Sequence, residues 1–236
     1  MFSLLRRRRG GVKSTELLAQ FAHEARQPLS AARYAFQVLR TGAAGDQRER
    51  AFAMLDRQLT RLDRFFDDLL DESGLELGKT TLHTERLDLR GLVEDVTESV
   101  RPQMAEKQQS VDTHLPENPV WVEADPARLQ QVVSNLLLNG VRYTGLGGRL
   151  SLDVSEGPNE AVLKVRDTGR GIPADLLPHV FEPFRTGDTG SEHGLGVGLA
   201  IVRQLVTLHG GTIRASSAGP GGGSEFVVTL PTCRVT

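Results

Sequence analysis

Residues 135–143 read Asn135-Leu136-Leu137-Leu138-Asn139-Gly140-Val141-Arg142-Tyr143. The leucines continue an apolar series that starts at Leu129, and its steps of three and four predict a helix capped by Asp125-Pro126. Polar residues at the same steps share the other side of this helix: Asn135, Asn139, Arg142 and Tyr143. Amides suit Mg²⁺, arginine suits phosphate and a tyrosine ring suits a base. The stripe is therefore a candidate nucleotide site, although most such stripes are solvated faces.

Two glycine-rich segments further along the chain point to the same kind of ligand. Asp167-Thr168-Gly169-Arg170-Gly171-Ile172-Pro173 follows an expected strand, where glycines allow a ligand to approach the backbone closely. Asp167 can accept a hydrogen bond from an exocyclic amine or can simply close an Asx-type turn. Gly194-Leu195-Gly196-Val197-Gly198-Leu199 leads into a helix whose first amides attract phosphate. The polar residues 185–193 between them are expected to form a mobile lid.

Several other classes of protein are excluded. No strand directly precedes the glycine run at 194–198, as a dinucleotide fold requires, and no Gly-Lys-Ser/Thr of a P-loop is present. The lysine strand and catalytic loop of serine/threonine kinases are also missing. A net charge of −2 gives no argument for nucleic acid binding. The single cysteine, Cys233, and the lack of any apolar run near the ~20 residues of a membrane span favour a cytoplasmic protein without a transmembrane segment.

Residues 86–236 are expected to form an α+β sandwich around these segments. Alternating apolar residues predict strands at 110–115, 120–123, 149–155, 161–166, 212–215 and 225–230. Helices are expected at 89–107, from 126 onward and at 199–208. Pro102 should kink or shorten the first of these helices. His209 ends the last one, where a cation is favoured. Helices grouped with an antiparallel or mixed sheet indicate the sandwich.

Residues 14–73 carry a different pattern. Apolar residues recur in alternating steps of three and four from Leu18 to Leu39 and again from Phe52 to Leu69. Gly42 lies in the break between the two stripes, so we expect an antiparallel helical hairpin. A lone hairpin cannot bury both apolar faces, and we therefore expect a homodimer with a four-helix bundle. Residues 1–13 are expected to be a basic N-terminal tail and residues 74–85 a linker.

The first of these helices contains Phe21-Ala22-His23-Glu24-Ala25-Arg26-Gln27-Pro28-Leu29. His23 falls two positions past Phe21 and so points away from the apolar seam. A neutral imidazole attacks phosphorus through one ring nitrogen, and a carboxylate bound to the other nitrogen strengthens it as a nucleophile. Glu24 is the candidate for that role. Pro28 removes a hydrogen bond to the Glu24 carbonyl, which predicts either a signal-sensitive kink or a tolerated bend.

Taken in order, these segments resemble the H, N, G1, F and G2 boxes of bacterial sensor histidine kinases. The F box corresponds to Phe181-Glu182-Pro183-Phe184. The resemblance spans roughly residues 14 to 230 and implies a dimerisation and histidine phosphotransfer hairpin at 14–73. It also implies a catalytic ATP-binding domain at 86–236, of the gyrase, Hsp90, histidine kinase and MutL superfamily. The expected fold is α+β: a helical hairpin in a dimeric four-helix bundle, followed by an α/β sandwich ATP-binding domain.

The resemblance implies a role for each site residue, with ATP and Mg²⁺ as cofactors. Asn139 would ligate the metal, Asn135 and Arg142 would line the phosphates, and the glycine run would close over the triphosphate. Tyr143 and Asp167 would hold the adenine. The implied nucleotide-binding set is Asn135, Asn139, Arg142, Tyr143, Asp167, Gly169, Gly171, Phe181, Phe184, Gly194, Leu195, Gly196, Val197, Gly198 and Leu199. His23, assisted by Glu24, would accept the phosphoryl group and pass it to an aspartate in the receiver domain of a response regulator.

Two positions depart from related patterns. Hydrolysing members of the superfamily carry a glutamate where this chain has Asn135, and an amide cannot act as a general base, so wasteful hydrolysis should be slow. Gln27 stands where the commonest kinases carry threonine or asparagine for dephosphorylation, which leaves phosphatase activity open. Alternatives are an ATPase or serine kinase of the same superfamily, or a non-catalytic dimeric scaffold. Few residues precede the His23 helix, so the signal is expected from a removed sensor domain or a separate sensor protein.

Overall fold

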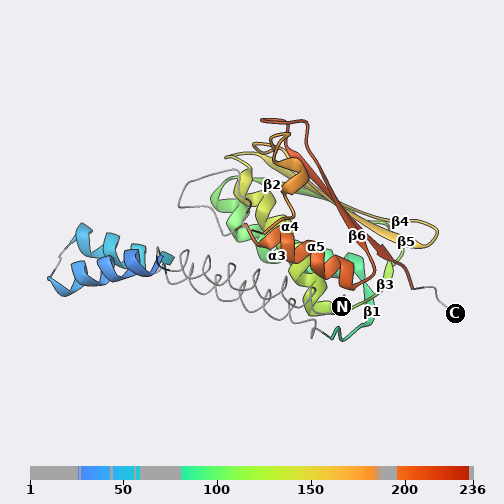
Figure 1. Cartoon of the computed structure of the whole chain (residues 1–236), viewed down its shortest axis with the longest axis horizontal. Coiled ribbons are helices and arrows are strands. Elements are labelled where there is room, and N and C mark those ends of the chain that lie inside the picture. The colour runs from blue at the N-terminus through green and yellow to red at the C-terminus, as the bar shows by residue number, and fades with distance from the viewer. Residues whose placement is uncertain are drawn as a thin grey trace, which may run out of the picture. The chain divides into compact units, whose positions relative to one another are not determined.

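The chain divides into two compact units, Met1–Gly78 and Lys79–Thr236 (Figure 1). The structure is a computed structural model that describes residues 26, 28–42, 45–55, 57–58, 81–183, 185 and 196–233. Within these ranges, no helix is both long enough and apolar enough to cross a membrane.

The described part of the first unit is a helical hairpin, as expected. Residues 28–40 and 46–55 are helical. The Thr41 N–H and hydroxyl close the first helix by donating to the carbonyl oxygens of Gln37 and Val38. Gly42 follows with a φ of 81°, a left-handed conformation that suits glycine at the end of a helix. The local sequence pattern was sufficient to find this hairpin because both its helices and its turn are specified by neighbours along the chain.

The second unit is an α/β sandwich in which three helices cover one face of a five-stranded sheet (Figure 1). The elements in order are β1 (Glu85–Asp88), α3 (Leu89–Glu106), β2 (Ser110–His114), β3 (Trp121–Ala124), α4 (Pro126–Tyr143), β4 (Arg149–Glu156), β5 (Glu160–Asp167), η1 (Leu177–His179), α5 (Gly198–Leu208), β6 (Thr212–Ser216) and β7 (Ser224–Pro231). The strand order is β2-β4-β5-β7-β6, with β2 parallel to β4 and every other pair antiparallel. The expected mixed sheet is confirmed.

The core of this unit lies between the helices and the sheet. Along β4, β5 and β7 every second side chain is buried: Leu150, Leu152, Val154, Ala161, Leu163, Val165, Phe226, Val228 and Leu230. α4 faces them with side chains that are at most 1% exposed: Leu129, Val132, Val133, Leu136 and Leu137. This burial fixes the rotation of α4 about its axis, because turning its apolar side toward water would lose the hydrophobic contribution.

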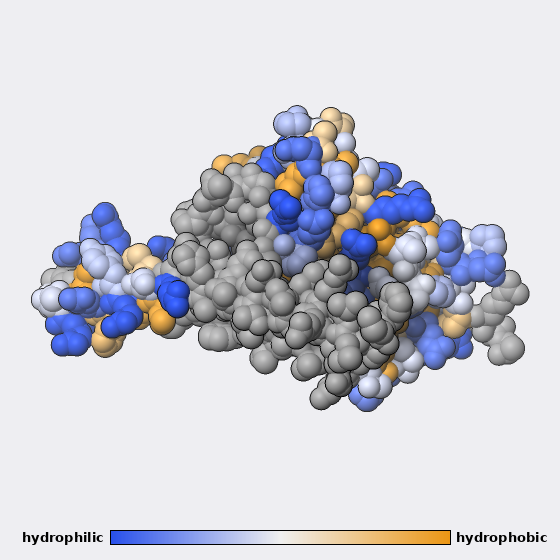
Figure 2. Space-filling view, viewed as in Figure 1, coloured by the Kyte–Doolittle hydropathy of each residue, from blue (hydrophilic) through white to orange (hydrophobic). Residues whose placement is uncertain are grey.

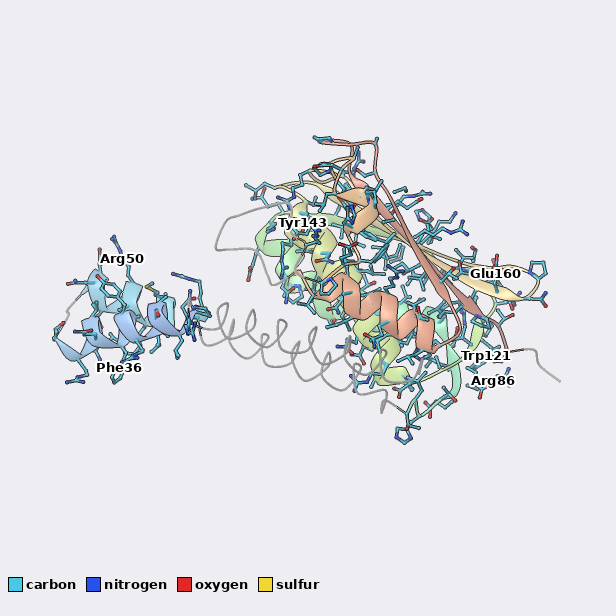
Figure 3. All side chains as sticks on the ribbon, in the orientation of Figure 1. Phe36, Arg50, Arg86, Trp121, Tyr143 and Glu160 are labelled. Atoms are coloured by element: carbon cyan, nitrogen blue, oxygen red, sulfur yellow. The ribbon has the colours of Figure 1, made fainter. Side chains whose placement is uncertain are left out.

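β1 was not expected from the sequence. It pairs with β3 in a separate antiparallel ribbon, in which Arg86 lies opposite Glu123. The Arg86 guanidinium lies 4.2 Å from the centroid of the Trp121 ring (Figure 3). Four residues with no apolar alternation carry little strand signal of their own, so the pairing with β3 decides this element.

The helix expected at 89–107 is confirmed as α3, and of the kink or shortening expected at Pro102 the shortening does not occur, since the helix continues to Glu106. Proline removes one backbone donor and would normally weaken the helix at this point. Val100 and Met104 lie on either side of it and are 3% and 2% exposed. Their burial in the core holds the helix together across the proline.

His209 lies at the C-terminal end of α5, as expected. In place of a cation at that helix end, its side chain is a buried hydrogen-bonding group that is 8% exposed. Its Nε2 accepts the backbone N–H of Asp125 at 3.0 Å, and its Nδ1 lies 2.8 Å from the carbonyl oxygen of Leu205. A backbone N–H can only donate, so Nε2 carries no proton and Nδ1–H donates to Leu205. The neutral ring ties the end of α5 to the start of α4.

Asp125 joins three segments at the same place. Its Oδ1 accepts the Arg128 N–H at 3.2 Å, which caps α4, and its Oδ2 accepts the His83 N–H at 3.0 Å. Burial alone would raise the pKa of the Asp125 carboxyl. The N–H groups of His83, Arg128 and Ala127 and the charge of Arg128 outweigh burial and hold that pKa below its usual value.

Asp125→Ala should lower the free energy of unfolding by about 2 kcal/mol at neutral pH, since it removes a helix cap and a second backbone partner. Because the folded pKa is depressed, the contribution of the carboxylate is complete above its unfolded pKa and is lost as the pH falls through the folded pKa. The difference between wild type and variant should therefore shrink below about pH 4. Urea unfolding at several pH values measures it. The exposed Asp95→Ala in α3 is the control, and an equal loss there would contradict the prediction.

Candidate functional site

The second half of α4 presents the polar stripe that the sequence indicated. Asn135, Asn139 and Tyr143 are partly exposed and Arg142 is exposed, whereas the apolar side of the same helix is buried. Tyr143 lies at the C-terminal end of α4 (Figure 3). The helix therefore directs two amides, a guanidinium and a phenol ring away from the core.

The segment after β5 folds back onto this end of α4. The Arg170 N–H donates to the Tyr143 carbonyl oxygen at 3.1 Å, and the Arg170 guanidinium lies 4.3 Å from the centroid of the Tyr143 ring. Gly169 has no room for a side chain, because a Cβ there would lie 2.4 Å from the Tyr143 carbonyl oxygen. A Cβ on Gly140 would lie 3.9 Å from the Asp167 Cβ. The asparagine helix and the Asp167 segment, far apart in sequence, are thus brought together.

The Asp167 carboxylate already has two partners within the protein. Its Oδ1 accepts the Gly169 N–H at 2.7 Å, and its Oδ2 accepts the hydroxyl of Ser224. The Asx-type turn considered from the sequence is therefore present. Each carboxylate oxygen can accept more than one hydrogen bond, so the turn orients the group and is compatible with a further donor from a ligand.

The last hairpin of the sheet holds the Asp167 segment in place, and sequence reasoning missed this. The Ser217 hydroxyl accepts the Ile172 N–H at 2.9 Å. Gly171 has a φ of 71°, and a Cβ there would lie 2.0 Å from the carbonyl oxygen of Gly219. Backbone N–H groups of the loop at 219–223 donate to the carbonyl oxygens of Gly169 and Arg170. The glycine-rich segment at 219–223 was the available signal, but nothing local in the sequence indicated its partner.

α5 begins beside the asparagine stripe. A Cβ on Gly198, the first residue of the helix, would lie 3.9 Å from the Asn135 Cγ. Gly196 has a φ of 71°, Val197 is buried, and Leu199 forms the second helical position. Within the described residues no side chain caps this helix start. Its first N–H groups therefore have the geometry and partial charge that suit a phosphate.

Phe181 anchors the chain ahead of α5. Its ring packs edge-on against Phe226 of β7, with centroids 6.4 Å apart. The neighbouring Glu182 carboxylate lies 2.9 Å from His179 Nδ1 and 3.3 Å from Arg185 Nε. The hydrogen bond to His179 and the partner charges hold the pKa of Glu182 below its usual value. The Phe181 ring therefore holds the start of this segment against the sheet.

Two family models match the chain. The His Kinase A (phospho-acceptor) domain matches residues 13–78, and the histidine kinase-, DNA gyrase B- and HSP90-like ATPase matches residues 124–234. A solved structure of the mycobacterial sensor histidine kinase MprB is 30% identical, with a TM-score of 0.57, and the match covers 64% of this chain and 99% of that one. The chain belongs to the sensor histidine kinases.

Longer relatives match almost the whole of this histidine kinase sequence. The probable sensor histidine kinase TcrY of Mycobacterium tuberculosis is 37% identical over 220 residues, which cover 92% of this chain and 45% of TcrY. The structure of full-length ShkA in complex with AMPPNP is 28% identical with a TM-score of 0.71, and the match covers 94% of this chain and 46% of ShkA. The chain thus spans less than half the length of TcrY.

Six residues of the expected site lie outside the described part of the kinase: His23, Glu24, Gln27, Phe184, Gly194 and Leu195. Their roles, like those of the other site residues, stay predictions. The other twelve nucleotide-site residues are described, along with Gly140 and Ser224 beside them.

Gly169→Ala in the kinase should lower the free energy of unfolding by about 1–3 kcal/mol, because a Cβ there meets backbone atoms that cannot move aside. Affinity for Mg-AMPPNP should fall about tenfold or more, since the Asp167 segment must shift. Gly91→Ala in α3 is the matched control, because a Cβ there has nothing within 4 Å. That variant should instead stabilise the fold by about 0.5 kcal/mol. Thermal unfolding and calorimetric titration check both, and equal behaviour of the two variants would contradict the prediction.

Proposed function

We propose that this kinase uses Mg-ATP to phosphorylate its own His23 and then passes the phosphoryl group to an aspartate of a response regulator receiver domain. The observation that carries the proposal is the convergence of three segments of the second unit. The Asp167 segment is bonded to the end of α4 through Tyr143, and the start of α5 lies beside Asn135. ShkA, whose structure matches 94% of this chain, was solved in complex with AMPPNP.

In this proposal, different residues of α4 bind the metal, the phosphates and the adenine of the nucleotide. Asn139 offers an amide oxygen to Mg²⁺, which would neutralise charge on the triphosphate. Asn135 and Arg142 line the phosphates together with the first amides of α5. The Tyr143 ring stacks on the adenine, and the Asp167 carboxylate accepts a hydrogen bond from the exocyclic amine of the adenine. The donor set therefore fits both ATP and the metal.

The same residues direct the phosphoryl group away from water. Asn135 occupies a position beside Gly198, at the phosphate end of the proposed site, and its amide cannot remove a proton from water. A ring nitrogen of His23 attacks the γ-phosphorus, a nitrogen–phosphorus bond forms, and the bond to the bridging oxygen breaks with release of ADP. Glu24 holds the proton on the other ring nitrogen. Positioning and charge neutralisation supply most of the rate in transfers of this type.

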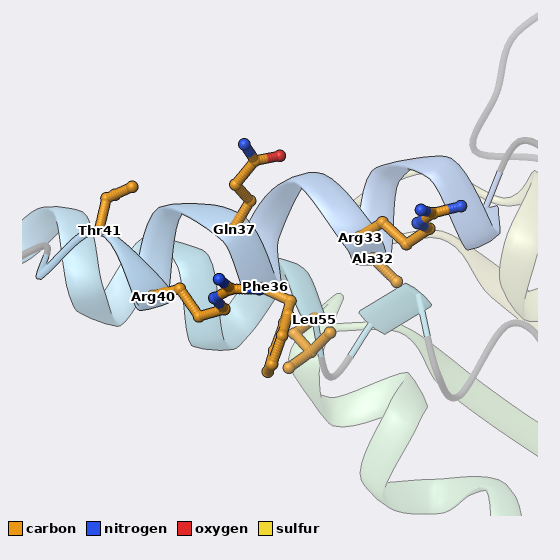
Figure 4. A pocket seen from close by; sticks show the side chains of 7 residues that line it. All are labelled: Ala32, Arg33, Phe36, Gln37, Arg40, Thr41 and Leu55. Atoms are coloured by element: carbon orange, nitrogen blue, oxygen red, sulfur yellow. The ribbon is translucent and has the colours of Figure 1, made fainter.

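The hairpin is proposed to act as a dimer. Leu29, Phe36 and Phe52 are 49–53% exposed. A groove between the two helices is lined by Ala32, Arg33, Phe36, Gln37, Arg40, Thr41 and Leu55 (Figure 4). Figure 2 shows hydrophobic residues among the hydrophilic ones on the visible surface of this unit. A second hairpin that covered these side chains would complete a four-helix bundle, which is the usual way to bury two such stripes.

Incubation of the wild-type protein with γ-labelled ATP and Mg²⁺ tests the proposal. We expect label on the protein that is lost in acid and kept in base, as expected for phosphohistidine, and that moves to an added receiver domain. Robust ATP turnover without such label would favour an ATPase, and acid-stable label would favour a serine kinase. Failure to bind Mg-AMPPNP in a calorimetric titration would favour a non-catalytic scaffold.

A further inference from the structure

The last turn of α4 carries two residues of the proposed site, Arg142 and Tyr143, and its carbonyl groups have no partners within the helix. Helix ends of this kind fray unless other groups bind their carbonyls. The Thr144 N–H donates to the Gly140 carbonyl oxygen at 3.0 Å, and the Arg170 N–H donates to the Tyr143 carbonyl oxygen at 3.1 Å. The carbonyl oxygens between and after these must find donors elsewhere.

Two side chains from the turn after α3 supply the missing donors. Lys107 Nζ lies 2.8 Å from the Val141 carbonyl oxygen and 3.2 Å from that of Arg142. Gln109 Nε2 lies 2.7–3.3 Å from three carbonyl oxygens, those of Val141, Thr144 and Gly145. Every carbonyl oxygen from residue 140 to residue 145 therefore accepts a hydrogen bond.

The turn after α3 has an unusual backbone that places these two side chains together. Gln108 has a φ of 52°, and no other non-glycine residue in the described ranges has a positive φ. This left-handed conformation is unfavourable for most side chains and persists where surrounding contacts enforce it. Here the backbone N–H of Gln109 donates to the Met104 carbonyl oxygen at 2.9 Å, and the Gly147 N–H donates to the Lys107 carbonyl oxygen at 3.0 Å. The turn is bonded both to its own helix and to the loop that follows α4.

Charge favours the same arrangement. The C-terminus of a helix carries a partial negative charge, and an ammonium group bound to its carbonyl oxygens is stabilising there. Arg142 is the basic residue in the last turn of α4, but it is exposed and belongs to the proposed phosphate site. Lys107 thus places a second cation at the helix end and binds the Arg142 carbonyl oxygen.

We propose that Lys107 and Gln109 are positioning residues for the nucleotide. This proposal rests on the nucleotide-binding roles proposed above for Arg142 and Tyr143. Lys107 and Gln109 fix the carbonyl groups of the last turn of α4, and so fix the directions in which the Arg142 and Tyr143 side chains leave the helix. Without them the turn frays, and the phosphate and adenine contacts lose their geometry. Lys107 and Gln109 act through the backbone of α4 and make no contact with the nucleotide themselves.

Lys107→Met tests the proposal because it keeps most of the aliphatic stem and removes both donated hydrogen bonds. In a calorimetric titration with AMPPNP and Mg²⁺, we expect its dissociation constant to rise about fivefold. Gln109→Leu should change it in the same direction. Lys107→Arg keeps the charge and the donors and should restore an affinity close to wild type. In the labelling assay, Lys107→Met should raise the KM for ATP, with little change in the rate at saturating ATP.

Arg90→Met is the matched control. Arg90 also donates to two backbone carbonyl oxygens, those of Pro116 and Glu117, at 3.1 and 2.6 Å, in the connection between β2 and β3. This variant should lower the Tm without changing the dissociation constant for Mg-AMPPNP. If Lys107→Met and Gln109→Leu lower the Tm but bind Mg-AMPPNP like wild type, the two residues are only a helix cap and the proposal is overturned. A wild-type protein that does not bind Mg-AMPPNP overturns the proposed function itself, which is a separate result.

Discussion

His23→Ala is expected to abolish labelling of the protein by γ-labelled Mg-ATP, a loss of about a thousandfold or more in rate. The alanine side chain has no lone pair to attack phosphorus. The proposed nucleotide site lies in the second unit, so we expect the affinity for Mg-AMPPNP to stay at the wild-type value. Filter-bound label after base treatment measures the first quantity, and calorimetry measures the second.

His114→Ala is the matched control for this variant. His114 is exposed on β2, with its Nδ1 3.3 Å from the Asp153 carboxylate, and has no part in the proposed chemistry. The His114→Ala variant should be labelled to the same extent as the wild-type protein. Persistent acid-labile label on His23→Ala would show that another residue accepts the phosphoryl group, and the assignment of His23 would be wrong.

Asn139→Ala is expected to have the second-largest effect, because it removes the proposed protein ligand of Mg²⁺. Metal coordination of a triphosphate contributes several kcal/mol to the transition state, so the rate of labelling should fall about a hundredfold or more. Asn139 is partly exposed on α4, and alanine is a good helix former, so the fold should be kept. The labelling rate and the Tm are the two measurements.

Asn139→Asp separates loss of a ligand from damage to the helix, since it keeps an oxygen at the same place and should retain part of the activity. Gln130→Ala, at an exposed position of the same helix, should behave like wild type. Chelation of Mg²⁺ should lower the labelling rate of the wild-type protein to the same extent as the Asn139→Ala substitution does. Labelling of Asn139→Ala at the wild-type rate would contradict the role given to this amide.

Much of the fold could be predicted from local patterns. The apolar side of α4 appeared in steps of three and four, and its five core residues are buried as expected. The alternating runs of β4, β5 and β7 gave strands whose ends differ from the prediction by at most one residue. These elements are specified by residues close together in sequence, because helix and strand periodicities are local properties.

The errors and omissions share a physical cause. β1 depends on β3, the length of α3 past Pro102 depends on burial in the core, and the state of His209 depends on the backbone of Asp125. The side chains that hold the site were missed for the same reason. Ser224 meets Asp167 across 57 positions, and Lys107 meets Val141 across 34. No periodicity encodes such contacts, since each requires the backbone of a distant segment.

The sequence by itself determined the kind of protein: a helical hairpin with a candidate phosphoacceptor at His23, and an ATP-binding sandwich whose ordered boxes include Asn139. Only the tertiary structure decided how those boxes meet. Gly169 seats the Asp167 segment on the Tyr143 carbonyl, and Lys107 binds the last turn of α4. The reason is that sequence specifies which groups can coordinate ATP, whereas their directions are set by carbonyl oxygens and N–H groups that only folding brings within hydrogen-bonding distance.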